Sequence, residues 1–531
     1  MVPTSADHPA PSIWRPLKTP AFRNLLIADI ISDVGTFMQT VGAAWLMVSL
    51  SAGPMYVALT QSASALPFFV FALPAGAIGD IVDRRKLILF TETWMLLVAV
   101  LLAGLTLAGL MSPLMLLILT FALSAGDAFE SPTWRAVLPE LVPKKDLTAA
   151  AALNGIEFNF ARAIGPALAG VLIAAAGVGT AFLVNAASFF GVIVVIARWK
   201  RNARKRTAPA ETLTGAMIAG VRYVRYSPEI RAIIFRSGCV MFFASALLAL
   251  LPSLAHSVKD SPVVYGLLLG CFGLGAVLGA LLLQPARARL STEVVVSGGI
   301  VIFGLTTTAI ASLHALPALS IAMLMGGAAW IVFISLFNVL ILNLTPDWVR
   351  ARVLAVSMLV LQGAVAAGSA AWGALAGRVG IHNALLWGGA GTMATAVLGL
   401  FLELPNLNID VTPWIHWPMP RIVNGAGAAD VEDAGPILVT VEYEVITEKT
   451  SEFLDAMHRY GRIRRRDGAS SWGVFRDLEA ENRYLETFMV DSWAEHQRQH
   501  ERLTQADREI EERVLSYTRS QPKVRHLVSA K

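Results

Sequence analysis

The feature that most constrains this chain is a series of twelve apolar stretches, each about 20 residues long or longer. A helix of that length can cross the hydrocarbon core of a bilayer with its backbone hydrogen bonds satisfied internally. The sequence therefore predicts an all-α polytopic membrane protein with spans at 22–50, 55–79, 87–110, 113–137, 147–176, 179–198, 231–256, 261–285, 291–312, 317–344, 350–377 and 381–403.

The composition excludes several other classes of protein. Of 531 residues, 55% are apolar and only 15% are charged, which is not typical of a soluble chain. The net charge of +5 comes from loops between the spans and does not indicate nucleic-acid binding. Cys239 and Cys271 lie in apolar segments, without the spacing of a metal site or a disulfide framework. Residues 1–21 lack the apolar core of a signal peptide, so we expect the first span to act as the insertion signal.

Basic residues concentrate in alternate loops, and this asymmetry predicts the orientation. If the N-terminus is cytoplasmic, the opposite loops hold only Lys259 and, near a helix end, Arg378. We therefore expect a multi-pass protein of the inner (plasma) membrane with both termini in the cytoplasm. The basic residues on the predicted cytoplasmic side are Arg84, Arg85, Lys86, Lys144, Lys145, Arg198, Lys200, Arg201, Arg204, Lys205, Arg206, Arg287, Arg289, Arg350 and Arg352.

An internal repeat divides the spans into two sets. A shift of 203 residues superimposes Gly35 on Gly238, Gly76 on Gly279, Gly165 on Gly368, Gly170 on Gly373, Gly177 on Gly380, Pro143 on Pro346 and Arg84 on Arg287. Two parallel six-helix halves would produce this pattern. The predicted halves are 22–198 and 231–404, joined by a cytoplasmic central loop at 199–230.

The composition changes after the last span. Residues 405–436 are rich in Pro, Gly and Asn and are interpreted as a linker. Residues 437–531 hold 33 of the 81 charged residues and no apolar span, which predicts a soluble domain on the cytoplasmic side. Its pattern predicts strands at 437–445, 471–478, 483–491 and 523–528, and helices at 449–461 and from a Ser492 cap to Tyr517. This β-α-β-β-α-β order is that of a ferredoxin-like α+β domain.

A short polar segment between the second and third spans carries a family resemblance. Gly76, Asp80, Arg84 and Arg85 match the signature loop of the major facilitator superfamily, Gly-x-x-x-Asp-Arg-x-x-Arg-Arg/Lys, although Ile81 replaces an arginine. We expect Asp80 to cap the helix that follows or to pair with an arginine. The resemblance implies secondary transport by alternating access, with the substrate between the two halves.

The fifth span resembles the antiporter motif of exporters in this superfamily, Gly-x-x-x-Gly-Pro-x-x-Gly-Gly. Gly165, Pro166 and Gly170 match it, whereas Ala161 and Ala169 replace two glycines. Further segments resemble the transmembrane secretion effector branch that includes the enterobactin exporters: Met38–Trp45, Ser131-Pro132 and Leu138–Pro143. This resemblance favours export.

Ionisable residues inside spans are costly and therefore indicate function. Asp29 and Asp33 share one face of the first helix, and paired carboxyls in a low dielectric suit proton exchange; packing against an arginine is the alternative. Further proton-coupling candidates are Asp127, Glu157 and Arg162, and we expect Asp33, Glu157 and Arg162 to form one network. We expect Arg135 to bridge to Glu130 or to the signature loop, and Arg236 to be a charge at a loop edge.

Aromatic and amide side chains on several spans could line an amphipathic substrate cavity, although most such residues pack against helices or lipid. The candidates are Phe37, Gln39, Asn159 and Trp330.

In the soluble domain, His496 and His500 have a spacing that could hold a metal, but no third ligand is evident, and packing is the favoured interpretation. The region of Trp472 and His500 could line a small cavity. The domain resembles the dimeric α/β-barrel domains related to antibiotic-biosynthesis monooxygenases, which implies dimerisation, and catalysis is the weaker alternative.

These observations predict a proton-coupled exporter of small hydrophobic or siderophore-like compounds, with no nucleotide-binding loop, catalytic triad, metal or cofactor. The expected partners are the substrate, protons, the lipid bilayer and a second copy bound through the C-terminal domain. An importer or facilitator of the same fold, or a membrane-anchored enzyme or sensor acting through the C-terminal domain, remain as alternatives.

Overall fold

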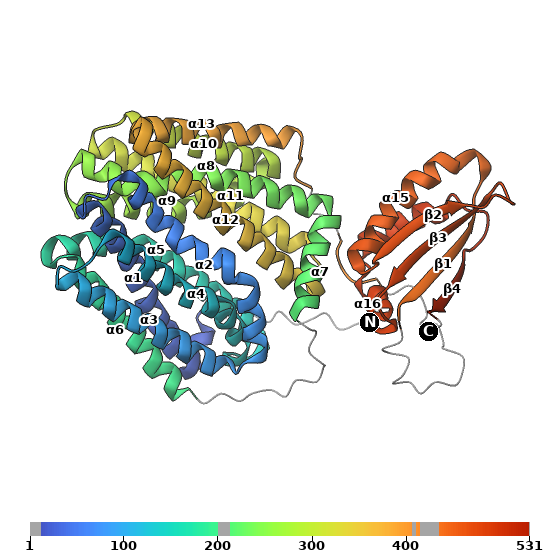
Figure 1. Ribbon diagram of the computed structural model, residues 1–531, viewed down its shortest axis with the longest axis horizontal. Coiled ribbons are helices and arrows are strands. Elements are labelled where there is room, and N and C mark those ends of the chain that lie inside the picture. The colour runs from blue at the N-terminus through green and yellow to red at the C-terminus, as the bar shows by residue number, and fades with distance from the viewer. Residues whose placement is uncertain (1–11, 200–212, 406–409, 415–434, 530–531) are drawn as a thin grey trace, which may run out of the picture. The chain divides into compact units, whose positions relative to one another are not determined.

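A computed structural model describes residues 12–199, 213–405, 410–414 and 435–529 (Figure 1). The side chains of Gly76 and Asp80, much of the central loop and most of the 405–436 linker lie outside this description. The chain divides into two compact units. The first comprises residues 1–209, 235–336 and 358–403, and the second comprises residues 210–234, 337–357 and 404–531.

The first unit is built from long helices, which are described here in chain order. The N-terminal half contains α1 (Pro20–Ser49), α2 (Gly53–Ile81), α3 (Arg84–Leu107), α4 (Pro113–Leu141), α5 (Leu147–Ala176) and α6 (Val178–Arg198). The C-terminal half contains α8 (Pro228–Val258), α9 (Pro262–Arg289), α10 (Thr292–Ser312), α11 (Leu316–Leu344), α12 (Asp347–Val379) and α13 (Ile381–Ala396), which continues as the 3-10 turn η3 (Val397–Leu400).

These bounds correspond to the predicted spans. Within the described residues, ten helices are long and apolar enough to cross a membrane. The helices α2 and α13 occupy the two other predicted positions. Residues with helix-terminating chemistry separate neighbouring spans: Gly177 adopts a positive φ of 83° between α5 and α6, and Gly380 adopts 87° between α12 and α13. These two glycines are one of the pairs that the internal repeat superimposes.

The polar segment between α2 and α3 is shorter than expected. The α2 helix continues to Ile81, and α3 begins at Arg84, so only Val82 and Asp83 separate the two helices. The cap of α3 is Asp83, whose side chain accepts a hydrogen bond from the Lys86 amide at 3.1 Å. The expectation that Asp80 caps this helix is therefore wrong, because Asp80 still lies in the last turn of α2.

Small residues bring the two halves together at the ends of the helices that lie away from the basic loops. A Cβ on Gly170 of α5 would lie 2.8 Å from the carbonyl oxygen of Pro262 and 3.2 Å from the Cα of Gly266, both in α9. Between α2 and α12, Ser62 donates a hydrogen bond to the carbonyl of Ala366 at 2.7 Å. Backbones can approach this closely only where side chains are very small.

The C-terminal domain has the predicted order of elements. It contains β1 (Ile437–Glu444), α15 (Thr450–Asp467), β2 (Ser471–Arg476), β3 (Arg483–Val490), α16 (Trp493–Arg502), α17 (Gln505–Leu515) and β4 (Lys523–Val528). The sheet is antiparallel with the order β2-β3-β1-β4, as in ferredoxin-like domains. Alternate residues of β1 pack beneath the helices, and the buried set is Ile437, Val439, Val441, Tyr443 and Val445.

The second helical segment of this domain differs from the prediction. Ser492 caps it as expected, by accepting a hydrogen bond from the Glu495 amide at 3.2 Å. The helix ends at Arg502, however, and α17 starts at Gln505. Thr504 and Asp507 form a capping box that starts the new helix, a local signal that outweighs the continuous apolar pattern.

The helix α7 (Leu213–Tyr226) lies within the predicted central loop and belongs to the second unit. The guanidinium of Arg466 in α15 lies 5.2 Å from the ring centroid of Tyr223 in α7. Arg222 also pairs with Glu495 at 3.3 Å. Burial raises the pKa of the Tyr223 hydroxyl, which keeps this side chain neutral in the contact.

Candidate functional site

Carboxyl groups gather inside the N-terminal half, where α1 and α5 face each other. The carboxyls of Asp33 in α1 and Glu157 in α5 lie close enough to interact electrostatically. Glu157 is only 5% exposed, and its Oε1 has no hydrogen-bond partner among the described residues. Two neighbouring carboxyls with little solvent around them do not easily ionise together, so such a pair can hold one proton.

A second pair of carboxyls lies between α3 and α4. Thr91 donates a hydrogen bond to Glu130 Oε2 at 2.7 Å, and the carboxyl of Glu92 lies close enough to Glu130 to interact electrostatically. Glu92 was not singled out by the sequence analysis, although an acid inside a span is the type of signal that could have identified it.

Asp29 connects these two pairs. It accepts a hydrogen bond from the Trp134 indole at 3.1 Å, and it interacts electrostatically with both Asp33 and Glu130. Asp127 is exposed and interacts with Asp33 in the same way. The four predicted acids, Asp29, Asp33, Asp127 and Glu157, thus belong to one electrostatically connected group.

The two arginines predicted to pair with these acids, Arg162 and Arg135, have other partners than expected. Arg162 packs over the Phe158 ring, with its guanidinium carbon 5.2 Å from the centroid. The described residues contain no ion pair between Arg162 and Asp33 or Asp127. Arg135 is exposed, and the described residues contain no bridge from it to Glu130, which accepts a hydrogen bond from Thr91. Arg135 interacts electrostatically with Asp127 instead.

The candidates for a substrate cavity have different surroundings. The Phe37 ring lies 5.7 Å from that of Phe158, next to Arg162. Gln39 is 4% exposed and accepts a hydrogen bond from Asn185, so its amide joins α1 to α6. Asn159 donates to the carbonyl of Gly155 in its own helix at 2.7 Å. Trp330 belongs to an aromatic cluster in the C-terminal half with Phe272, Phe303 and Phe333.

Residues of the antiporter-like motif contact both neighbours of α5. A Cβ on Gly165 would lie 2.7 Å from the Cβ of Phe37 in α1, while Gly170 faces α9. Glycine is required at both positions because a larger residue would push the helices apart.

In the C-terminal half, the prediction that Arg236 is a charge at a loop edge is wrong. Arg236 is fully buried and forms two hydrogen bonds with Glu293 of α10, at 2.8 and 2.7 Å, and a third with the carbonyl of Leu402 at 2.8 Å. A charge at a loop edge would be hydrated, whereas this arginine connects α8, α10 and the segment after η3.

The arginines after the α2–α3 break bind the other helix ends of the N-terminal half. Arg84 donates to Glu140 Oε1 at 2.8 Å and to the carbonyl of Ala136 at 2.7 Å. Arg85 donates to the carbonyl of Ile196 at 3.0 Å and to that of Ala197. These bonds place positive charge at the C-terminal ends of α4 and α6, where the helix dipole favours it.

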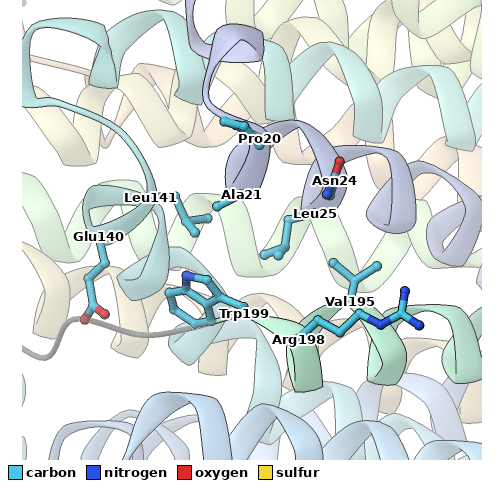
Figure 2. A pocket seen from close by; sticks show the side chains of 9 residues that line it. All are labelled: Pro20, Ala21, Asn24, Leu25, Glu140, Leu141, Val195, Arg198 and Trp199. Atoms are coloured by element: carbon cyan, nitrogen blue, oxygen red, sulfur yellow. The ribbon is translucent and has the colours of Figure 1, made fainter.

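A cavity of about 470 Å³ lies beside these contacts, between the ends of α1, α4 and α6. Figure 2 shows Leu25, Leu141 and Trp199 directed toward its interior, with Glu140 and Arg198 at opposite ends. Because its lining comes from one half of the bundle, it is not the site between halves that alternating access requires. The full lining is Pro20, Ala21, Asn24, Leu25, Glu140, Leu141, Val195, Arg198 and Trp199.

The histidines of the C-terminal domain form a packed cluster. One Nε2–H of the His496 and His500 pair donates to the other Nε2 at 3.2 Å, and the His526 ring lies 4.9 Å from that of His496. Burial and the neighbouring imidazoles lower the pKa of His496 to about 3, and burial and the Arg464 charge lower that of His500 to about 4. Within the described residues, no group of three or more His, Cys, Asp and Glu side chains could hold a metal ion.

The comparison with protein families decides the class of this protein. The family described as "transmembrane secretion effector" matches residues 11–531. The chain belongs to this family. Its fold and sequence agree with the predicted place in the major facilitator superfamily.

Characterised relatives include exporters. The chain is 23% identical to the multidrug efflux pump Tap of Mycolicibacterium fortuitum, covering 73% of this chain and 97% of that protein. It is 28% identical to the enterobactin exporter EntS of Salmonella typhimurium, covering 50% of this chain and 64% of EntS. It is 25% identical to the staphyloferrin A transporter of Staphylococcus aureus, covering 47% of this chain and 63% of that transporter. Thus the chain spans less than two thirds of the length of two of these relatives.

Solved structures show the same fold at low sequence identity. The nucleoside transporter NupG superimposes with a TM-score of 0.61 at 13% identity, covering 72% of this chain and all of NupG. A D-xylose–proton symporter superimposes with a TM-score of 0.60 at 12% identity, covering 73% of this chain and 98% of the symporter.

Proposed function

We propose that this protein exports a small hydrophobic or siderophore-like compound in exchange for protons, by alternating access. The observation that carries this proposal is the Asp33–Glu157 pair, in which the carboxyls of two different helices interact electrostatically next to a further acid, Asp29. Proton uptake or loss there would alter the contact between α1 and α5. The names of the related efflux pump and enterobactin exporter support the substrate class.

We infer that the basic side of the bundle faces the cytoplasm, which places both termini there. The close contacts of α5 with α9 and of α2 with α12 then lie on the outer side. This closure includes the His256 imidazole, whose ring lies 5.9 Å from that of Trp45.

In the proposed cycle, substrate enters from the cytoplasm while the outer contacts are closed. Separation of α5 from α9 then opens the outer side, and a proton taken up there reaches Asp33 and Glu157. Release of that proton to the cytoplasm completes the exchange. Asp29, Asp127 and the Glu92–Glu130 pair provide further carboxyls along the way, as proton relays in membrane proteins require.

The proposal is tested by transport into inverted membrane vesicles under an imposed pH gradient, with ethidium as a fluorescent hydrophobic cation. We expect gradient-driven uptake by the wild type and a loss of at least about tenfold in Asp33→Asn and Glu157→Gln, because an amide cannot take up the proton. Glu479→Gln is the control, since Glu479 is exposed in the turn between β2 and β3 and lies outside the bundle. Uptake that is equal in all four proteins would overturn the assignment of the carrier.

We also infer that the C-terminal domain pairs with a second copy through the face of the sheet that lies opposite its helices. Phe475 and Leu527 on this face are 57% and 49% exposed. The mass of the purified full-length protein in detergent, from light scattering, tests this. We expect a dimer that dissociates in the Phe475→Glu/Leu527→Lys variant; a wild-type monomer would contradict it.

A further inference from the structure

A hollow on the C-terminal domain has the chemistry of a ligand site that the transport cycle does not use. It has a volume of about 390 Å³ and lies between the exposed side of α15 and the edge strand β2. Seven residues line it: Asp455, His458, Arg459, Gly461, Arg462, Arg465 and Trp472. It is separate from the histidine cluster, because His500 is not part of this lining.

Trp472 is held in place from beneath. Its indole N–H donates a hydrogen bond to Glu486 Oε1 at 2.9 Å, and Glu486 is completely buried. Gly461 makes room for the indole, because a Cβ at this position would overlap the ring. Glycine is less favourable than alanine in the interior of a helix. The site therefore depends on a residue that is unfavourable for α15 but allows the ring to lie against it.

Positive charge surrounds this fixed ring. The guanidinium of Arg465 lies 5.6 Å from the Trp472 centroid and donates a hydrogen bond to the Trp472 carbonyl at 3.2 Å. Arg459 and Arg462 are exposed and form no ion pair within the described residues. The only acid in the lining, Asp455, cannot neutralise three arginines.

His458 completes the rim. Its ring lies 5.9 Å from that of Trp472 in an edge-to-face arrangement. Its Nδ1–H donates to the carbonyl of Leu454 at 2.7 Å, which leaves Nε2 as the free ring nitrogen. A ligand could therefore meet an aromatic face, one imidazole nitrogen and several guanidinium groups within one hollow.

We propose that this hollow binds a small planar organic anion, such as an aromatic phosphate or carboxylate. The aromatic ring would stack on the half-buried Trp472, and the anionic group would bind Arg459 and Arg462, whose planar guanidiniums match the oxygens of phosphates and carboxylates. This proposal does not rest on the proposed transport activity, because every residue in it lies in the C-terminal domain.

The experiment measures binding of 1-naphthyl phosphate to the full-length protein by equilibrium dialysis, in nanodiscs of zwitterionic lipid. We expect saturable binding by the wild type, at least about tenfold weaker binding by Arg459→Gln/Arg462→Gln, and wild-type binding by Arg476→Gln. The double variant changes only exposed side chains, so a loss of binding by this variant cannot be attributed to misfolding. Arg476 is an exposed arginine of β2 outside the lining.

Two further measurements test the ring. Trp472→Phe should retain binding within about threefold, whereas Trp472→Ala should weaken it at least about tenfold. Inorganic phosphate should compete only weakly because it cannot stack. No saturable binding into the millimolar range, equal binding by the double variant, or equally strong competition by inorganic phosphate would each overturn the proposal.

Discussion

The interior of the N-terminal half and that of the C-terminal domain both contain buried charged groups, but they neutralise them differently. In the N-terminal half, Asp33 and Glu157 lie next to each other, and Arg162 packs on an aromatic ring instead of pairing with them. In the C-terminal domain, three of the buried acids are paired with arginines. Glu486 pairs with Arg464 at 3.3 Å, and Arg466 pairs with Asp467 at 2.8 Å and with Asp507 at 2.7 Å.

This difference separates two uses of buried charge. An acid paired with an arginine remains ionised and determines one geometry, because breaking the pair would leave a buried charge without a partner. An acid paired with another acid changes its charge by taking up one proton. We therefore interpret the paired charges of the C-terminal domain as structural and the carboxyls of the bundle as exchangeable.

The largest expected effect contrasts one acid from each region. Glu486→Gln should destabilise the C-terminal domain by about 3–5 kcal/mol, because it leaves Arg464 buried without its acid and weakens bonds to Tyr443 and Trp472. Glu157→Gln should not reduce stability, because it removes a buried carboxyl that has no cation. Hydrogen exchange of the full-length protein measures the change in stability in both variants. A larger loss of stability for Glu157→Gln would reverse our interpretation of the two regions.

A similar effect is expected where the bundle itself uses a paired charge. Arg236→Leu should destabilise the C-terminal half by about 3–5 kcal/mol, since Glu293 would lose a two-bond ion pair. The double variant Arg236→Leu/Glu293→Leu should recover most of that loss. Thermal unfolding in detergent distinguishes these outcomes. A single variant as stable as the wild type would show that this pair is not structural.

A smaller effect concerns pH. His500 has a pKa of about 4 in the folded domain, below its unfolded value of about 6.5. The unfolded state therefore binds more protons as the pH falls below about 6.5, and stability decreases. Between about pH 7 and pH 5 the wild type should lose about 2 kcal/mol more than His500→Gln. Hydrogen exchange in α16 measures the difference, and the exposed His458→Gln should behave as the wild type. Equal pH dependence in His500→Gln and the wild type would contradict the buried neutral state.

Much of the fold could be predicted because it depends on local patterns. Span length, Gly177 and Gly380 between helices, and the alternation along β1 each act within a few residues. The predicted acids of the site were also identifiable, since acids inside spans are rare. Their partners were not, because the contacts of Arg162, Arg236 and Glu130 depend on helices that are distant in the chain.

The sequence by itself determined a twelve-span membrane protein with a charged ferredoxin-like domain, because hydropathy and residue periodicity reflect the solvent on each side of an element. Only the tertiary structure decided which buried charges are paired. Asp33 lies next to Glu157, and Arg236 pairs with Glu293, because helix packing brings these side chains together. The same packing placed Gly461 beneath Trp472 and so created the hollow on α15.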